Sequence, residues 1–201
     1  MKYGIAPEVI SLFKVDLNEF MFFMYLPIKM PGSKTRMEDR LSPLYAMVKE
    51  VLENEKEHLH DKYIYLTIKH MFHPEGYSHN RPNWHSDGFG SDDINYIFYS
   101  NTPTEFCVQE YKNISADDKL SMIQFEEQSD EKNIITYPSN TLLKLSPYNI
   151  HRIGYKAVPG PRIFIKISIS KNQYRLKGNS HNYLFDYNWD LQERQIERNV
   201  P

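Results

Sequence analysis

Two histidines and an aspartate combine the residue types and the spacing that a metal site needs. His85 and Asp87 lie two positions apart, so both side chains point to the same side of an extended strand end. His151, which follows Pro147-Tyr148-Asn149, is the candidate for a third ligand. Two imidazoles and one carboxylate on one face of an octahedron leave three positions open, where an ion such as Fe(II) can accept a co-substrate and O₂.

A second pair has the same spacing. His73 and Glu75 are also two positions apart, and such pairs are common by chance because 26 of the 201 residues are acidic. Pro74 lies between them and restrains His73 to an extended conformation. Asp87, by contrast, leads into a flexible glycine-containing segment. We therefore prefer the pair of His85 and Asp87 and keep the earlier pair as the alternative.

One run of residues near the C-terminus predicts a strand with two different faces. Isoleucine occupies every second position from 163 to 169, which predicts one buried face. The other face carries Arg162, Phe164, Lys166 and Ser168. Two cations and a hydroxyl on one line indicate either a solvated surface or an interior site that binds an anion. The strand alone leaves both interpretations open.

The elements around these residues are mostly short strands. Runs rich in β-branched and aromatic residues alternate with turn residues after position 62. They predict strands at 63–72, 94–99, 105–111, 121–125, 133–137, 142–145, 149–153 and 162–170. Before them, residues 39–57 carry apolar side chains at spacings of three and four, which predicts a helix that begins at Ser42 and Pro43. We expect an α+β protein, mainly β, with this helix packed outside a sandwich or barrel.

Composition limits the class of protein. A length of 201 residues favours a single domain over 1–201, with 40% hydrophobic and 25% charged residues as in soluble globular proteins. The formal charge of −2 provides no basic excess, so nucleic acid is a possible but not a favoured partner. The single cysteine excludes an intramolecular disulfide and a cysteine-rich zinc site. No apolar run is long enough for a signal peptide or a membrane span, and we expect a soluble cytoplasmic protein.

Taken together, these residues resemble the Fe(II)- and 2-oxoglutarate-dependent dioxygenases. His85-Ser86-Asp87, then His151, then Pro159-Gly160-Pro161-Arg162 opening a strand, are similar to the pattern of the prolyl-hydroxylase-like members. The resemblance covers a little over half of the chain. It implies a double-stranded β-helix (jelly-roll) core over 62–172, with N-terminal helical support over 1–60 and a C-terminal extension over 173–201.

The resemblance also implies roles for single residues. His85, Asp87 and His151 would be the catalytic metal ligands, and Arg162 would pair with the distal carboxylate of 2-oxoglutarate. Many members place a serine two residues after the arginine, but position 164 here is phenylalanine. The hydroxyl partner must then come from elsewhere, and the candidates are Ser168, Tyr96 and Tyr99.

Two further cations need an interpretation. Lys166 shares the face of Arg162 and is a rival anchor for the anion, although Arg162 is preferred because it is nearer the metal-bearing end of the strand. Arg152, next to His151, points to the opposite face and is expected to be exposed to solvent.

The implied activity is that of an oxidoreductase with O₂ and 2-oxoglutarate as co-substrates. It would hydroxylate or otherwise oxidise an organic substrate, which is a small molecule, a nucleotide or nucleobase, or an amino-acid side chain. Two alternatives stay open. One is a cupin-like metal-dependent isomerase on the same β-architecture, and the other is a catalytically silent jelly-roll module in which Arg162 and Lys166 recognise an anionic partner. The sequence indicates neither the primary substrate nor the oligomeric state.

Overall fold

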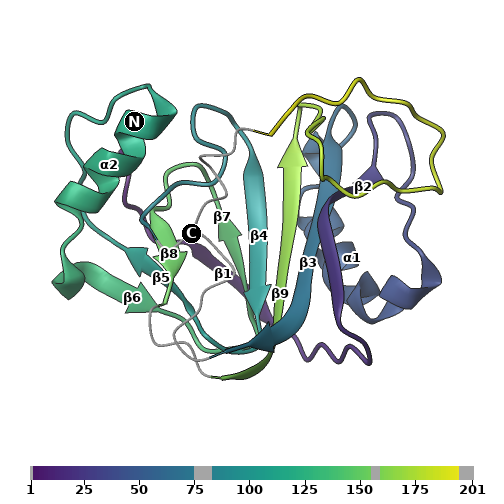
Figure 1. Ribbon diagram of the computed structural model, residues 1–201, viewed down its shortest axis with the longest axis horizontal. Helices are drawn as coiled ribbons and strands as arrows, with labels where there is room; N and C mark the ends of the chain where they lie inside the picture. The colour runs from purple at the N-terminus through teal and green to yellow at the C-terminus, as the bar shows by residue number, and fades with distance from the viewer. Residues whose placement is uncertain (1, 75–82, 155–158, 195–201) are drawn as a thin grey trace.

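The computed structural model describes residues 2–74, 83–154 and 159–194 (Figure 1). It is mainly β, with antiparallel sheets and few helices, and belongs to the α+β class. The strands described are β1 (Glu8–Leu12), β2 (Met21–Lys29), β3 (Tyr63–His73), β4 (Ile94–Tyr99), β5 (Thr104–Cys107), β6 (Ile134–Thr136), β7 (Thr141–Leu145), β8 (His151–Ile153) and β9 (Gly160–Ser170). The helices are α1 (Tyr45–Asn54) and α2 (Asp118–Gln128), with short 3₁₀ segments at Asp39–Leu44, Lys56–His58 and Glu131–Asn133.

The strands form two antiparallel sheets. The larger sheet has the order β1-β7-β4-β9-β3-β2, and the smaller one has the order β6-β5-β8. An isolated antiparallel bridge between His85 and His151 adds the stretch around residue 85 to the free edge of β8. From β3 onward the chain therefore passes back and forth between the two sheets, so that neighbours in space are distant in sequence.

The isoleucine face of β9 is buried, as the alternation predicts. Ile163, Ile165, Ile167 and Ile169 are at most 8% exposed and belong to one core cluster with apolar residues of β2 and β3. Helix α1 covers this side of the large sheet and contributes Met47, Val48 and Val51 to the same cluster (Figure 1). The prediction of a helix packed outside the sheet is thus confirmed.

The opposite face of the large sheet has an apolar half and a polar half. Over β4 and β7 it packs against the small sheet through an apolar cluster of Ile97, Tyr99, Phe106, Leu143 and Leu145. Over β9 and β3 the same face carries the polar side chains of Thr67, Lys69, Arg162, Lys166 and Ser168, because β3 and β9 pair in register with these residues on one side. The polar half of this face is where the candidate site lies.

Helix α2 replaces one predicted strand. Residues 121–125 were expected to be extended, but they lie in the middle of α2. Asp117 begins the helix, since its side chain accepts hydrogen bonds from the backbone nitrogens of Lys119 and Leu120, both at 2.9 Å. Ser121 and Phe125, one helical turn apart, are the buried residues of α2. The prediction of a strand was wrong because this cap and the four-residue spacing of the buried side chains favour a helix.

The N-terminal region contains more than helical support. Strands β1 and β2 form the two edges of the large sheet, a role the sequence did not reveal. The predicted helix over 39–57 is broken into two 3₁₀ segments and α1. Its first turn begins at Asp39 rather than at Ser42, with Pro43 inside the 3₁₀ segment.

Three other strands are shorter than expected, at Thr104–Cys107, Ile134–Thr136 and His151–Ile153. No helix in the described ranges is long and apolar enough to cross a membrane.

Candidate metal centre

The three predicted ligands converge. His85 and His151 exchange two backbone hydrogen bonds of 3.0 and 2.9 Å across the bridge, which places their rings side by side with centroids 4.5 Å apart. Asp87 follows on the same side, with its Oδ2 at 3.7 Å from Nε2 of His151. One ligand atom from each of the three residues lies within 4.8 Å of the other two. Within the described ranges this is the group of His, Cys, Asp and Glu residues that could hold a metal ion.

Both imidazoles are oriented for metal binding by the same local contact. Nδ1 of His85 lies 2.7 Å from the carbonyl oxygen of Asn83, and Nδ1 of His151 lies 3.1 Å from that of Asn149. A backbone carbonyl accepts a hydrogen bond, so each Nδ1 carries the proton and each Nε2 presents its lone pair. Two Nε2 atoms and a carboxylate are a donor set that suits Fe(II) and related divalent ions.

Asp87 is held as a carboxylate by its neighbours. Its Oδ2 forms an ion pair with Nζ of Lys166 at 3.0 Å. Burial raises the pKa of Asp87, but the Lys166 ammonium beside it outweighs this effect and holds the pKa well below its ordinary value. Gly88 follows directly after the carboxylate with a φ of +76°, a left-handed conformation that favours glycine.

Lys166 is a buried cation at the centre of the site. Its ammonium lies 3.0 Å from Asp87 and 3.2 Å from the hydroxyl of Tyr25, and it sits 5.0 Å from the centroid of the Tyr25 ring. Burial lowers the pKa of Lys166, yet the charge of Asp87 and the contact with Tyr25 outweigh it and raise the pKa above its ordinary value. Lys166 therefore stays charged and currently pairs with a candidate metal ligand.

Arg162 is the second buried cation on this face. It is 2% exposed and donates from Nε to the carbonyl oxygen of Asn101 at 3.0 Å and from Nη2 to that of Thr102 at 3.2 Å. No carboxylate in the described part of the chain forms an ion pair with it, and burial lowers its pKa to about 10. A guanidinium offers five N–H donors, so these two contacts leave donors for an anion.

The three residues predicted to supply a hydroxyl group to the co-substrate lie in different surroundings. Ser168 lies on the inner face and donates to Oδ1 of Asn95 at 2.6 Å. Tyr99 lies on that face too, but its hydroxyl donates to the carbonyl oxygen of Tyr137 within the apolar half. Tyr96 lies on the opposite face of β4, in the core beneath α1, and donates to Glu55 at 2.6 Å. Tyr96 is therefore not positioned to bind a ligand between the sheets.

A third cation of the site, Lys69, was not predicted from the sequence. Lys69 on β3 lies directly opposite Phe164 in the register with β9, so it shares the face of Arg162 and Lys166. Burial and the charges of Lys166 and Arg162 lower the pKa of Lys69 to about 8. The alternation of β3 contained the signal, because Ile64, Leu66 and Ile68 occupy its core face and Lys69 falls on the other.

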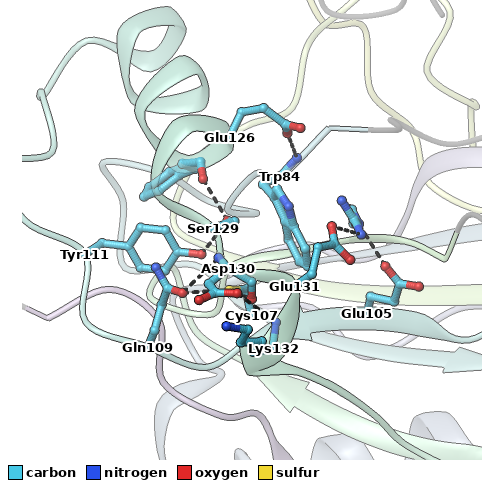
Figure 2. Close-up of polar contacts among 12 residues, drawn as sticks. Trp84, Glu105, Cys107, Gln109, Tyr111, Glu126, Ser129, Asp130, Glu131 and Lys132 are labelled. Atoms are coloured by element: carbon cyan, nitrogen blue, oxygen red, sulfur yellow. Dashed lines mark hydrogen bonds and ion pairs between the residues drawn. The ribbon is translucent and has the colours of Figure 1, made fainter.

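An ionic contact on the outer side of the small sheet fixes the strands that carry the histidines. Arg152 is 4% exposed, which corrects the expectation that it faces solvent. Its guanidinium lies 4.2 Å from the Trp84 ring centroid and forms ion pairs of 2.8 Å with Glu105 and with Glu131. Figure 2 shows these two carboxylates beside Trp84, and Glu126 of α2 accepts a hydrogen bond from the Trp84 backbone at 3.1 Å. Trp84 precedes His85, so this contact joins both histidine-bearing segments.

The alternative ligand pair is not brought to this site by any described contact. His73 is 1% exposed at the end of β3, where it lies opposite Gly160 of β9. Glu75 lies outside the described residues.

Comparisons with known proteins identify no family. No family model matches the sequence, and no curated protein matches it. Among solved structures, the chain is similar to EvdO2 from Micromonospora carbonacea var. aurantiaca, with 10% sequence identity and a TM-score of 0.38. The match covers 66% of this chain and 60% of the EvdO2 chain.

Proposed function

We propose that the protein is a non-haem Fe(II)- and 2-oxoglutarate-dependent oxygenase. The observation that carries the proposal is the convergence of His85, Asp87 and His151, whose ligand atoms lie within 4.8 Å of one another. Two imidazoles and one carboxylate bind one face of a divalent ion and leave the remaining positions for co-substrates.

The strand order supports a double-stranded β-helix as the finer description of the fold. In the large sheet β7, β4, β9 and β3 are neighbours, and in the small sheet the bridge at His85 extends the order β6-β5-β8. From β3 to β9 the chain crosses between two facing sheets at every step except that from β5 to β6, which both lie in the small sheet, and this order is compatible with a jelly roll. In this arrangement the metal ligands come from the small sheet and the cations from the large one.

The residues of the chain would divide the work as follows. His85, His151 and Asp87 would hold the metal through two Nε2 atoms and a carboxylate oxygen. Arg162 would bind the distal carboxylate of 2-oxoglutarate with its remaining guanidinium donors. When bound, Fe(II) with 2-oxoglutarate and O₂ supplies an oxidant for a C–H bond of the substrate, with release of succinate and CO₂.

The ion pair between Lys166 and Asp87 must rearrange if Asp87 binds a metal ion. Its ammonium contacts the same Oδ2 of Asp87 that approaches His151. A metal ion at that oxygen would displace the ammonium or turn the carboxylate so that Lys166 pairs with the other oxygen. In the second case Lys166 would fix the orientation of the carboxylate.

Anaerobic titration tests the proposal. Fe(II) added with 2-oxoglutarate under argon should produce a weak visible charge-transfer band in the wild-type protein and in the control His60→Ala, which changes an exposed histidine. The band should be lost in His85→Ala and should require a much higher 2-oxoglutarate concentration in Arg162→Met. The absence of a band in the wild-type protein would contradict the proposal.

The same ion pair favours the anion-binding module as a second candidate. There the ammonium of Lys166, 3.0 Å from Asp87, would permanently take the place of a metal ion. Metal analysis of the purified protein separates the two functions, since a module predicts no stoichiometric iron, manganese or zinc.

A further inference from the structure

We propose that Tyr25 is a positioning residue of the metal centre, which holds the ammonium of Lys166 in place while Asp87 binds a metal ion. The proposal rests on the proposed function only for the metal ion at Asp87. It selects between the two rearrangements of the ion pair, because the ammonium stays and the carboxylate turns to offer an oxygen to the metal. It adds a residue of the site that the sequence did not indicate.

A bulge in β2 brings Tyr25 to the face of the large sheet that carries the site. Phe23 lies opposite Ile68 of β3. Leu26, three positions later, lies opposite Leu66, which is only two positions from Ile68. β2 therefore has one extra residue at this point. Without it, Tyr25 would share the core face with Phe23, two positions before it. The bulge thus redirects the phenol from the core to the inner face.

Contacts with β3 and with the C-terminal extension fix the bulge. Tyr25 has a φ of +48°, which is left-handed and unfavourable for a side chain of this size. Its N–H donates to Oγ1 of Thr67 at 3.1 Å. Ser180 of the extension, which passes beside β2 in Figure 1, donates from its N–H to the carbonyl oxygen of Met24 at 2.7 Å. Its hydroxyl accepts the N–H of Met24 at 2.9 Å. A strained residue that its surroundings hold in this way indicates a functional role for its side chain.

The phenol lies against Lys166. Thr67, which contacts Tyr25 across the bulge, is directly opposite Lys166 in the register of β3 and β9. Nζ of Lys166 donates to the Tyr25 hydroxyl at 3.2 Å and lies 5.0 Å from the centroid of the ring. The ring packs edge-on against Tyr174 at a centroid distance of 5.1 Å, which fixes its orientation. The same ammonium pairs with Asp87 at 3.0 Å.

These contacts determine how the site responds to a metal ion. In the metal-free protein the Lys166 ammonium is compensated by Asp87 as well as by Tyr25. A divalent ion takes up charge of that carboxylate, and the ammonium then depends more on the oxygen and the ring of Tyr25. The Tyr25 hydroxyl therefore stabilises the metal-bound state more than the metal-free state, and its removal should weaken metal binding.

Titration with Mn(II) tests this role without any reaction. The EPR signal of free Mn(II) measures how much of the ion the full-length protein binds. Tyr25→Phe keeps the ring and removes the hydroxyl, and it should weaken Mn(II) binding about tenfold, the effect of one hydrogen bond to a charged group. Tyr96→Phe is the matched control, since it removes a hydroxyl that bonds to Glu55 on the opposite face of the sheet. It should bind Mn(II) within about twofold of wild type.

A double variant separates positioning from a general loss of structure. In a Lys166→Met background the ammonium is absent, so Tyr25→Phe should no longer change the affinity for Mn(II). Urea unfolding of the metal-free proteins supplies the structural reference, because the loss of either hydrogen bond in Tyr25→Phe or Tyr96→Phe lowers stability. Circular dichroism establishes that each variant is folded.

The outcomes separate this inference from the proposed function. Where wild-type protein binds Mn(II), a Tyr25→Phe variant with wild-type affinity, or an equal effect of Tyr25→Phe in the Lys166→Met background, would overturn the inference alone. Mn(II) binding that depends on Tyr25, without a charge-transfer band from Fe(II) and 2-oxoglutarate, would support the inference and overturn the proposed function. Wild-type protein that binds no Mn(II) would overturn both.

Discussion

Replacement of Lys69 by methionine should stabilise the protein without ligands, although it removes a residue of the site. Burial and two neighbouring cations lower the pKa of Lys69 from 10.5 to about 8. The charged form is therefore disfavoured in the folded state relative to the unfolded chain. A shift of about 2.5 pKa units at about 1.36 kcal/mol per unit corresponds to at most about 3 kcal/mol of the free energy of unfolding.

The sign of the effect follows from proton linkage. Below pH 8 Lys69 is protonated in both states, and the full destabilisation is present. Between pH 8 and pH 10.5 the folded protein releases the proton while the unfolded chain keeps it, so wild-type stability rises with pH in this window. Methionine has no such proton. The advantage of Lys69→Met should fall from about 3 kcal/mol at pH 7 to about 1.5 kcal/mol at pH 9.5.

Urea unfolding at pH 7 and pH 9.5 measures this difference. Wild type, Lys69→Met and the exposed control Lys14→Met are compared under the same conditions, with sulfate and phosphate absent because they would bind the cations. Lys14→Met should follow the wild type at both pH values. A destabilised Lys69→Met, or an advantage that does not change with pH, would refute the placement of Lys69 on a buried face beside Lys166 and Arg162.

Three other substitutions test the scaffold. Ile167→Ala removes a fully buried side chain beneath α1 and should lower the free energy of unfolding by about 3 kcal/mol in urea. Asp117→Ala removes the cap of α2 and should lower it by about 1 kcal/mol, with the helix losing hydrogen-exchange protection at its first turn. Arg152→Met leaves Glu105 without its partner and should lower it by about 2 kcal/mol, while metal affinity measured by competition with a chelator also falls because Trp84 and His151 are no longer joined. An Arg152→Met protein with unchanged stability and metal affinity would show that the contact is incidental.

The residues of the site that could be predicted are those whose spacing matches a strand. Arg162, Lys166 and Ser168 are separated by even numbers of positions, and the isoleucines at 163, 165, 167 and 169 indicated which face is buried. The alternation of side chains along a strand also shows why Tyr96 and Tyr99 could not both face the site between the sheets. They are an odd number of positions apart on β4, and a strand sends such residues to opposite faces.

The rest depended on tertiary contacts. Lys69 was not recognised as a site residue because the inner face of β3 also carries Tyr63 and Tyr65, so that both faces of the strand contain large hydrophobic residues. Arg152 was placed correctly on the face opposite His151, but no local pattern indicates that Trp84 and two carboxylates cover that face. Helix α2 was missed although Asp117 gave a start signal, because the apolar residues after it are also compatible with a short strand.

Anomalous X-ray diffraction from crystals grown with Mn(II), a redox-stable substitute for Fe(II), would show whether His85, Asp87 and His151 bind one metal ion. We expect one anomalous peak within bonding distance of Nε2 of His85, Nε2 of His151 and a carboxylate oxygen of Asp87. The contrary result is a metal bound elsewhere or not at all, with the ion pair between Lys166 and Asp87 unchanged at about 3.0 Å.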